Sequence, residues 1–187
     1  MKHTLRTILF TALLTSFCLP GCKPAASNPQ PTEVPTDLPP GITTGMAAAL
    51  NSLVMVDDFP LYTMHQSGEY PEIATVDVEP ATDFSCALFS ALGDEDSRIF
   101  GRNFDWYYSP ALMLFYEPPD GYASVSMVDL AYLGVEADNA LGLAELPLED
   151  RLFLLNAVHL PFDGMNEAGL AIGMAAVFES VSGYDPA

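Results

Sequence analysis

The stretch FSCALFSALGDEDSRIFGRNFDW (residues 84–106) contains the pattern that decides the fold. Its first part, Phe84 to Ala91, is an apolar run of the length and composition typical of a buried strand. Residues 93–97 form a polar turn, and Arg98 to Asp105 supplies the returning strand. Two apolar runs joined by a five-residue loop predict a β-hairpin.

The segments on either side of this hairpin alternate between strand and helix patterns. Thr43 or Thr44 can cap a helix whose apolar face holds residues 47, 50, 53 and 54. A second helix is expected over residues 148–159, on a face formed by Leu148, Leu152, Leu155 and His159, between Pro147 and Pro161. Strands are expected at 73–78, 112–116, 123–130, 160–163 and 170–178, with a turn at 166–169. Antiparallel hairpins with helices packed outside predict an α+β layered domain.

Length and charge limit the classes of protein to consider. The chain has 187 residues, of which 50% are hydrophobic, enough for one domain with a substantial core. Six Lys and Arg stand against 25 Asp and Glu, a net charge of −19. Such a charge repels phosphate backbones and anionic lipid, so we expect no nucleic-acid partner and no basic membrane-binding patch.

The N-terminus has the pattern of an export signal. Lys2 and Arg6 precede an apolar stretch at 8–19, which is too short to span a bilayer comfortably. The following residues, Leu19-Pro20-Gly21-Cys22, resemble the lipobox of bacterial lipoproteins. We therefore expect a signal over 1–22, lipidation of Cys22, a Pro-rich tether over 23–41, and an extracytoplasmic, membrane-anchored protein at the periplasm or cell surface. A plain secreted protein and an uncleaved anchor remain alternatives.

One cysteine is then left for the folded domain. Of the three cysteines, Cys18 leaves with the signal and Cys22 is lipidated, so no intramolecular disulfide is available to Cys86. A lone thiol in an exported protein is either a small buried hydrophobe or a reactive group. Composition does not decide between the two.

Two motifs around this cysteine are specific when taken together. Cys86 is followed by Arg102 and Asp105 within FGRNFDW (100–106), and FDGMNEAGL (162–170) comes after them in the chain. The spacing Cys–x15–Arg–x2–Asp and the second motif resemble the choloylglycine hydrolase and acid ceramidase family over residues 84–180. The resemblance implies an αββα four-layer N-terminal-nucleophile hydrolase fold, with 42–85 as a propeptide-like segment and 86–187 as the N-terminal half of a catalytic domain that is incomplete in this chain.

The resemblance also implies a chemistry. Self-cleavage between Ser85 and Cys86 would make Cys86 the N-terminal residue, with its thiol as nucleophile and its own α-amine as base. Arg102 would lie beside the thiol and favour the thiolate, and Asp105 would orient the α-amine. Strict strand alternation nevertheless places positions 102 and 105 on opposite faces.

Three further positions are implied only by the resemblance. The backbone N–H of Ala176 would contribute to an oxyanion hole, at a position where bile salt hydrolases commonly carry Asn. Trp106 and Tyr107 would line an acyl pocket. The implied activity is hydrolysis of the linear C–N bond of a small-molecule N-acyl amide, with no cofactor and no metal.

Other readings of the same residues stay open. A non-catalytic lipoprotein binding module, or an inactive fragment that keeps the fold, has the same signal and hairpin. A papain-like pair of Cys86 with His159 is a further alternative. The sequence does not fix the oligomeric state and leaves room for a homo-oligomer.

Overall fold

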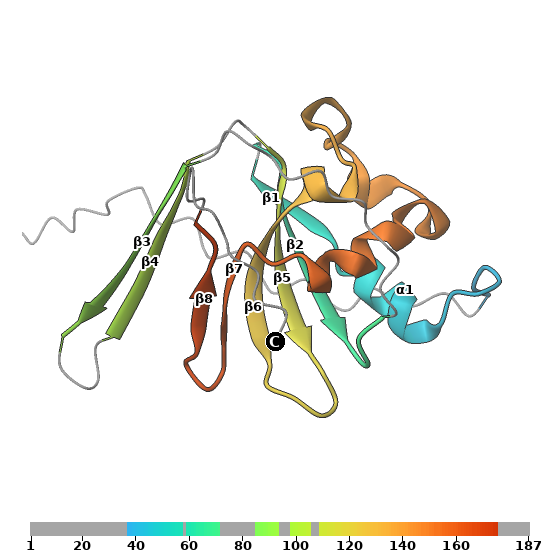
Figure 1. The fold of residues 1–187 in the computed structure, drawn as a ribbon. Coiled ribbons are helices and arrows are strands. Elements are labelled where there is room, and N and C mark those ends of the chain that lie inside the picture. Colours follow the sequence, from blue (N-terminus) through green and yellow to red (C-terminus); the bar gives the residue numbers. More distant parts are fainter. Residues whose placement is uncertain (1–36, 58, 72–84, 94–97, 106–108, 176–187) are drawn as a thin grey trace, which may run out of the picture.

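The computed structural model describes residues 37–57, 59–71, 85–93, 98–105 and 109–175, and these form a mixed α+β fold (Figure 1). The elements are, in chain order, α1 (Thr44–Asn51), β1 (Val54–Asp57), β2 (Leu61–Ser67), β3 (Ser85–Leu92), β4 (Arg98–Asp105), β5 (Ala111–Glu117), β6 (Ser124–Asp129), the 3₁₀ helices η1 (Leu130–Leu133), η2 (Ala137–Asn139), η3 (Leu143–Glu145) and η4 (Leu148–His159), β7 (Asp163–Asn166) and β8 (Ala171–Gly173). The predicted α+β class is confirmed. The strand expected at 73–78, the export signal and residues 23–36 of the tether lie outside the described residues.

The predicted hairpin of β3 and β4 is confirmed, and it forms a two-stranded sheet of its own. The remaining strands form a six-stranded sheet in the order β1-β2-β5-β6-β7-β8. Strands β2 and β5 run parallel, and every other neighbouring pair is antiparallel. The sheet is therefore mixed: β2, a strand that was not predicted from the sequence, is joined to its parallel partner β5 by a crossover instead of a direct turn.

The N-terminal helix ends earlier than its apolar spacing predicts. Thr43 provides the cap, since its hydroxyl accepts the N–H of Met46 at 3.3 Å. The helix stops at Asn51, and Val54, which was expected on its apolar face, starts β1 opposite Thr63. A β-branched residue fits a strand better than a helix, and pairing with β2 decides its state here.

The core lies between the helices and one face of the six-stranded sheet. Strands β2 and β5 alternate, so that Tyr62, Met64, Leu112 and Leu114 are almost fully buried on that face. They pack in one cluster with residues of the helical segments, among them Leu50, Leu130, Leu143, Leu154 and Ala157. The removal of these apolar side chains from water is the main driving force for folding. Within the described residues, no helix is long and apolar enough to cross a membrane.

The helix expected over residues 148–159 is present, but as a 3₁₀ helix. With three residues per turn, it buries Arg151, Leu154 and Ala157 at three-residue spacing, together with Leu155. The α-helical spacing predicted a face that included His159, whose side chain is only half-buried. The difference of 0.6 residue per turn explains why the buried face moved.

The second predicted hairpin is confirmed with shifted strands. Its turn lies at Asn166–Gly169, where Asn166 Oδ1 accepts the N–H groups of Ala168 and Leu170 and Gly169 takes a φ of 82°. Strand β7 begins at Asp163 instead of Leu160. Of the strand expected over 170–178, the structure shows β8 at Ala171–Gly173, and residues 176–178 lie outside the described residues. The predicted boundaries were wrong at β7 because residues 160–162 still connect it to η4.

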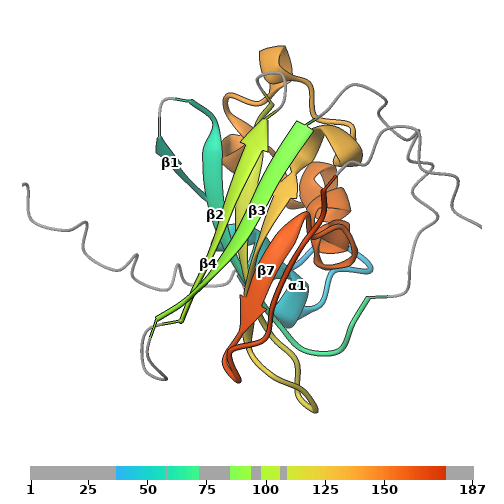
Figure 2. The same ribbon diagram turned by 60° about the vertical axis from the view of Figure 1, so that its left-hand side comes forward.

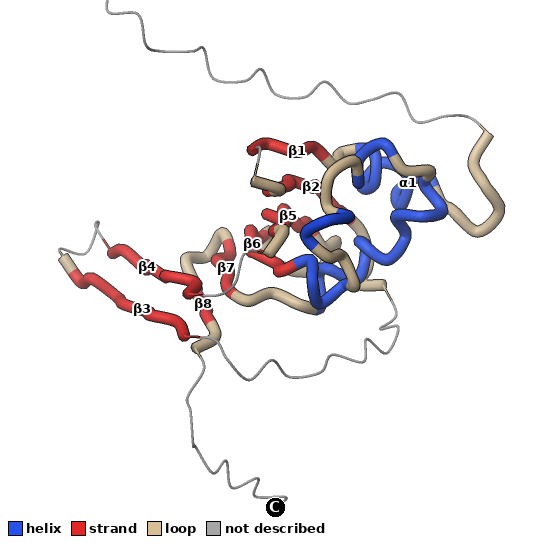
Figure 3. The backbone as a smooth tube through the Cα atoms, turned by 90° about the horizontal axis from the view of Figure 1, so that it is seen from above, coloured by secondary structure: helices blue, strands red, loops and turns tan. Residues whose placement is uncertain are grey.

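The hairpin β3–β4 lies across the six-stranded sheet from the helices. Met113, Met127 and Asp163 are register partners, so they share the face opposite the core. Figures 2 and 3 show β3 and β4 beside β7 and β8 on this face, with α1 and the 3₁₀ helices on the other. Two β layers therefore meet at Asp163, with the helices behind one of them.

Candidate active site

One face of the hairpin lies against the six-stranded sheet, and Cys86, Leu88, Arg102 and Phe104 are among its side chains. Cys86 stands opposite Phe104 and Leu88 opposite Arg102, so all four share one face of the hairpin. Cys86 and Arg102 are diagonal neighbours in this register, within reach of a long side chain. The hairpin thus brings the predicted nucleophile and the predicted cation together.

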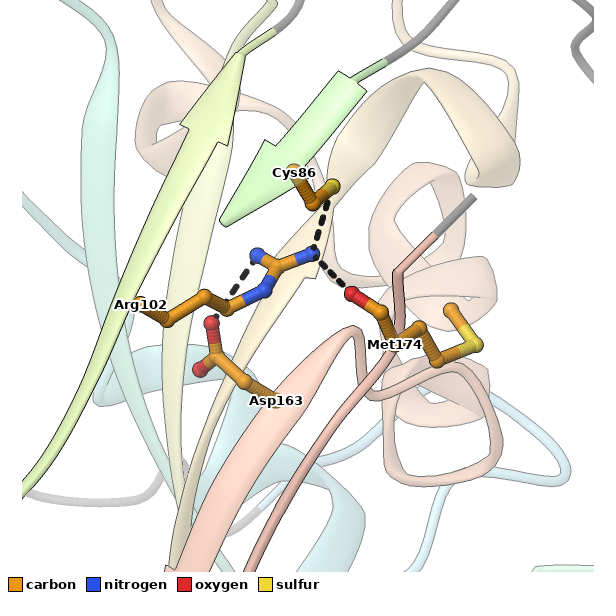
Figure 4. A network of polar contacts seen from close by, with 4 residues as sticks. All are labelled: Cys86, Arg102, Asp163 and Met174. Atoms are coloured by element: carbon orange, nitrogen blue, oxygen red, sulfur yellow. Dashed lines mark hydrogen bonds and ion pairs between the residues drawn. The ribbon is translucent and has the colours of Figure 1, made fainter. Parts of the chain in front are cut away.

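The guanidinium of Arg102 binds three groups (Figure 4). Its Nη2 donates to the Sγ of Cys86 at 3.5 Å and to the backbone carbonyl of Met174 at 3.1 Å. Its Nη1 lies 3.0 Å from Oδ2 of Asp163, which makes a salt bridge between β4 and β7. One side chain therefore connects the thiol, the sheet and the segment that follows β8.

Arg102 is held in a largely buried position. Its side chain is 6% exposed and that of Asp163 is 21% exposed. The guanidinium carbon lies 4.5 Å from the centre of the Phe104 ring, a cation–π distance. Within the described residues, Nε of Arg102 is buried without a hydrogen-bond partner. A fixed, partly desolvated cation beside a sulfur stabilises negative charge on that sulfur.

The close approach of the hairpin to β8 depends on a glycine. A Cβ built at Gly173 would lie 2.5 Å from Cδ2 of Leu88 and 3.0 Å from Cζ of Phe100. Phe104 adds an edge-to-face contact with Phe162, at 5.2 Å between ring centres. Small and aromatic residues thus fit the hairpin against the sheet near Cys86.

An apolar pocket of about 350 Å³ opens beside Arg102. Its wall carries the charged groups of Arg102, Asp163 and Asp129 among aromatic and aliphatic side chains. The apolar lining includes Phe59, Leu61, Phe104, Pro110, Met127 and Phe162. The volume falls within the range of small-molecule sites, which are mostly apolar with a few polar groups.

Asp105 is not brought into this cluster. It stands opposite Ser85 at the end of β4 and is exposed, on the other face of the hairpin from Arg102. Its position is nevertheless beside the Ser85–Cys86 peptide bond, in the neighbouring strand. The predicted Trp106, Tyr107, Ala176 and Cys22 lie outside the described residues.

The structure places His159 away from Cys86. Its Nε2 lies 2.9 Å from the carbonyl of Pro71, and its ring is 6.1 Å from that of Tyr70. Cys86 instead contacts Arg102 from the hairpin. The described contacts therefore give no support to a papain-like pair.

Asp163 is the contact that sequence reasoning missed. At the sequence level it belongs to the FDGMNEAGL motif, where an acid is most simply a hairpin end. The available signal was the scarcity of cations, since only three Arg or Lys residues follow position 85. A buried arginine needs an acidic partner, so a buried Arg102 would have predicted a nearby Asp or Glu. The register of β7 against β6 was needed to identify which acid it is.

Among the described residues, no group of three or more His, Cys, Asp or Glu side chains could hold a metal ion. Comparisons of the chain with profiles of protein families, with curated proteins and with solved structures gave no match.

Proposed function

We propose that this protein is an exported, membrane-tethered hydrolase of linear amide C–N bonds. Its nucleophile would be Cys86, made N-terminal by self-cleavage of the Ser85–Cys86 bond. The proposal includes a lipid anchor on Cys22 and an αββα N-terminal-nucleophile fold, of which the described α+β layers would be a part. It rests on the resemblance of the two motifs together with the geometry at Cys86.

The observation that carries the proposal is the contact of Cys86 with Arg102. Their atoms lie 3.5 Å apart, and the guanidinium is held by Asp163 and Met174 as well. A structural cysteine needs no charged partner, whereas a nucleophilic thiol gains from a nearby cation. A thiol placed beside one of the few cations of an acidic chain therefore favours the reactive reading of Cys86.

The maturation step would use the same sulfur as catalysis. The thiol attacks the carbonyl carbon of Ser85, the C–N bond to Cys86 breaks, and the nitrogen takes up the thiol proton. Ser85 is then held on sulfur as a thioester. Water hydrolyses it to a carboxylate and a free thiol, and leaves Cys86 with an α-amine.

Substrate hydrolysis would repeat these steps on an external amide. The sulfur attacks the acyl carbon, the amine departs with a proton, and water releases the acid from the thioester. The apolar pocket beside Arg102 is suited to the acyl group, because most of its lining is aliphatic or aromatic.

Intact-mass measurement of the purified full-length chain tests the proposal. The wild type should yield a fragment that begins at Cys86, and Cys86→Ala should stay whole. Cys86→Ser should be cut slowly, because a hydroxyl is the weaker nucleophile. A Cys86→Ala chain that is cut at the same bond would point to an outside protease and would remove self-processing from the proposal.

A second candidate is a non-catalytic binding module with the same pocket. Two observations favour it: among the described residues that line the pocket Cys86 does not occur, and Asp105 lies on the other hairpin face. Such a module would bind a fatty acid in the uncut Cys86→Ala chain as tightly as in the wild type. A wild-type chain that stays uncut and binds the fatty acid as tightly as Cys86→Ala would decide for the binding module.

A further inference from the structure

The geometry points to Asp163 as a positioning residue for Cys86, acting through Arg102. This inference rests on the proposed function, in which the guanidinium serves the thiol. Asp163 touches Arg102 at 3.0 Å, and Arg102 touches the sulfur. The carboxylate thus fixes where the cation stands, and its own contact is with the cation.

The hairpin needs such a link because it is not part of the six-stranded sheet. Strands β3 and β4 pair only with each other in the sheet topology. Among the described residues, no turn, loop or cap backbone hydrogen bond joins them to the other strands. The hydrogen bonds from Arg102 to Asp163 and to the carbonyl of Met174 therefore hold the hairpin face against the sheet.

Of the three partners of Arg102, Asp163 is the one that lies in a strand of the six-stranded sheet. It lies in the interior strand β7, opposite Met127 of β6 and Gly173 of β8. Met174 follows the end of β8, and Cys86 belongs to the separate hairpin. A site held by a strand is more precise than one held by a loop. The position of the guanidinium is therefore set from β7.

The two Nη atoms of Arg102 bind different partners. Nη1 faces the carboxylate, and Nη2 faces the sulfur and the carbonyl of Met174. Loss of the Asp163 side chain would leave the guanidinium of Arg102, whose side chain is 6% exposed, with only neutral or sulfur partners. A buried charge that loses its partner rearranges towards water. Arg102 would then move away from Cys86.

Alkylation of Cys86 by a charged and by a neutral reagent distinguishes a change in the position of Arg102 from a change in the folding stability of the chain. Iodoacetate is an anion and iodoacetamide is neutral, so the ratio of their rates reports a cation beside the sulfur and cancels changes in access. Peptide mass spectrometry on the full chain assigns the product to Cys86. Arg102→Ala gives the reference ratio for a thiol without the cation.

Asp163→Ala is the decisive variant, because two effects oppose each other. Removal of a negative charge alone would raise the iodoacetate-to-iodoacetamide ratio, whereas loss of the Arg102 position lowers it. We expect the ratio to fall at least threefold, to near the Arg102→Ala value. Asp163→Asn keeps an acceptor for Nη1 and should stay at or above the wild-type ratio. Asp138→Ala, at an exposed acid of η2, should leave the ratio unchanged.

A wild-type or higher ratio in folded Asp163→Ala would overturn the inference. If that variant does not fold, Asp163→Ser gives the same comparison, because its hydroxyl is too short to reach Nη1. The ratio is measured whether or not the chain cleaves itself. An uncut wild type with the expected ratios would therefore refute the proposed function and leave the role of Asp163 standing.

Discussion

The six-stranded sheet and the hairpin β3–β4 are built in different ways. The sheet has backbone pairing along each strand and a face covered by helices, with Leu112 and Met64 both 0% exposed. The hairpin is paired only with itself, and Phe89, Leu92 and Ile99 are 60%, 76% and 58% exposed. Its attachment consists of side chains, above all Arg102.

Because of this difference, the folding stability of the chain and the reactivity of Cys86 depend on different sets of contacts. Buried apolar area and paired backbone determine whether the chain folds. The position of Cys86 depends on a few side-chain contacts that a well-folded sheet does not by itself guarantee. Substitutions in the two regions should therefore differ in kind, and the sheet should give the largest losses of stability.

Leu112→Ala should have the largest effect on stability. Leu112 is fully buried in β5, between its register partners Tyr62 and Val128. Truncation of a buried leucine costs about 2–5 kcal/mol, from lost transfer free energy and the cavity left behind. Urea denaturation followed by circular dichroism measures it. A loss below about 1 kcal/mol would contradict the assignment of the core to this face.

Arg151→Ala should rank second. Arg151 is 6% exposed in η4, and its Nη1 donates to the carbonyl of Leu50 at 2.9 Å, near the end of α1. Burial lowers the pKa of Arg151, partly offset by the charge of Glu145. Hydrogen bonds from charged groups contribute about 1.5–3 kcal/mol. We expect a loss of about 2 kcal/mol in the free energy of unfolding, and Glu149→Ala in the same helix, an exposed residue, is the matched control.

Tyr62→Phe should have a smaller effect that depends on pH. The hydroxyl of Tyr62 donates to the carbonyl of Ala140, and burial raises the pKa of Tyr62 above 10.0. A raised pKa favours the neutral form in the folded state, so its contribution is complete below pH 10 and is lost as the pH rises above it. The variant should lose about 1 kcal/mol at pH 8 and decline less steeply than the wild type between pH 10 and 11.5. Melting temperatures of the variant and the wild type, measured over this pH range, check both expectations. Some decline at high pH should remain in both proteins, because burial also raises the pKa of Tyr116.

Leu92→Ala should have the smallest effect. Leu92 is the last residue of β3, stands opposite Arg98 at the start of β4, and is 76% exposed. Substitutions at such positions usually stay within about 0.5 kcal/mol. Equal urea midpoints for this variant and the wild type would sharpen the contrast with Leu112. A loss of more than 1 kcal/mol would show that the hairpin is as much a part of the core as the sheet.

Local patterns were enough to predict the elements with strong periodicity. The pairing of β3 with β4, the turn at Asn166–Gly169 and a helix cap at Thr43 or Thr44 each depend on neighbouring residues. Each is confirmed in the described residues, the cap at Thr43. The register that puts Cys86 and Arg102 on one face also follows from strand alternation once the hairpin is known.

The missed features depend on residues far apart in the chain. The parallel pairing of β2 with β5 joins residues about fifty positions apart, and no local pattern encodes it. The salt bridge of Arg102 with Asp163 spans 61 positions and needs both sheets in place. The pocket beside Arg102 brings together residues 59–61, 109–111 and 127–129, which only the folded sheet makes neighbours.

The parallel pairing of β2 with β5 gives the proposed cut an unexpected product. Residues 44–67 supply a helix, an edge strand and an interior strand, so cleavage before Cys86 would yield a protein of two chains held without any covalent bond. The lipid on Cys22 would belong to one chain and the nucleophile to the other. Retention of the enzyme at the membrane would then depend on the noncovalent contacts of residues 44–67 with the other chain, among them the β2–β5 pairing and the hydrogen bond of Arg151 with Leu50. Denaturant would release the catalytic chain while its anchor stayed behind.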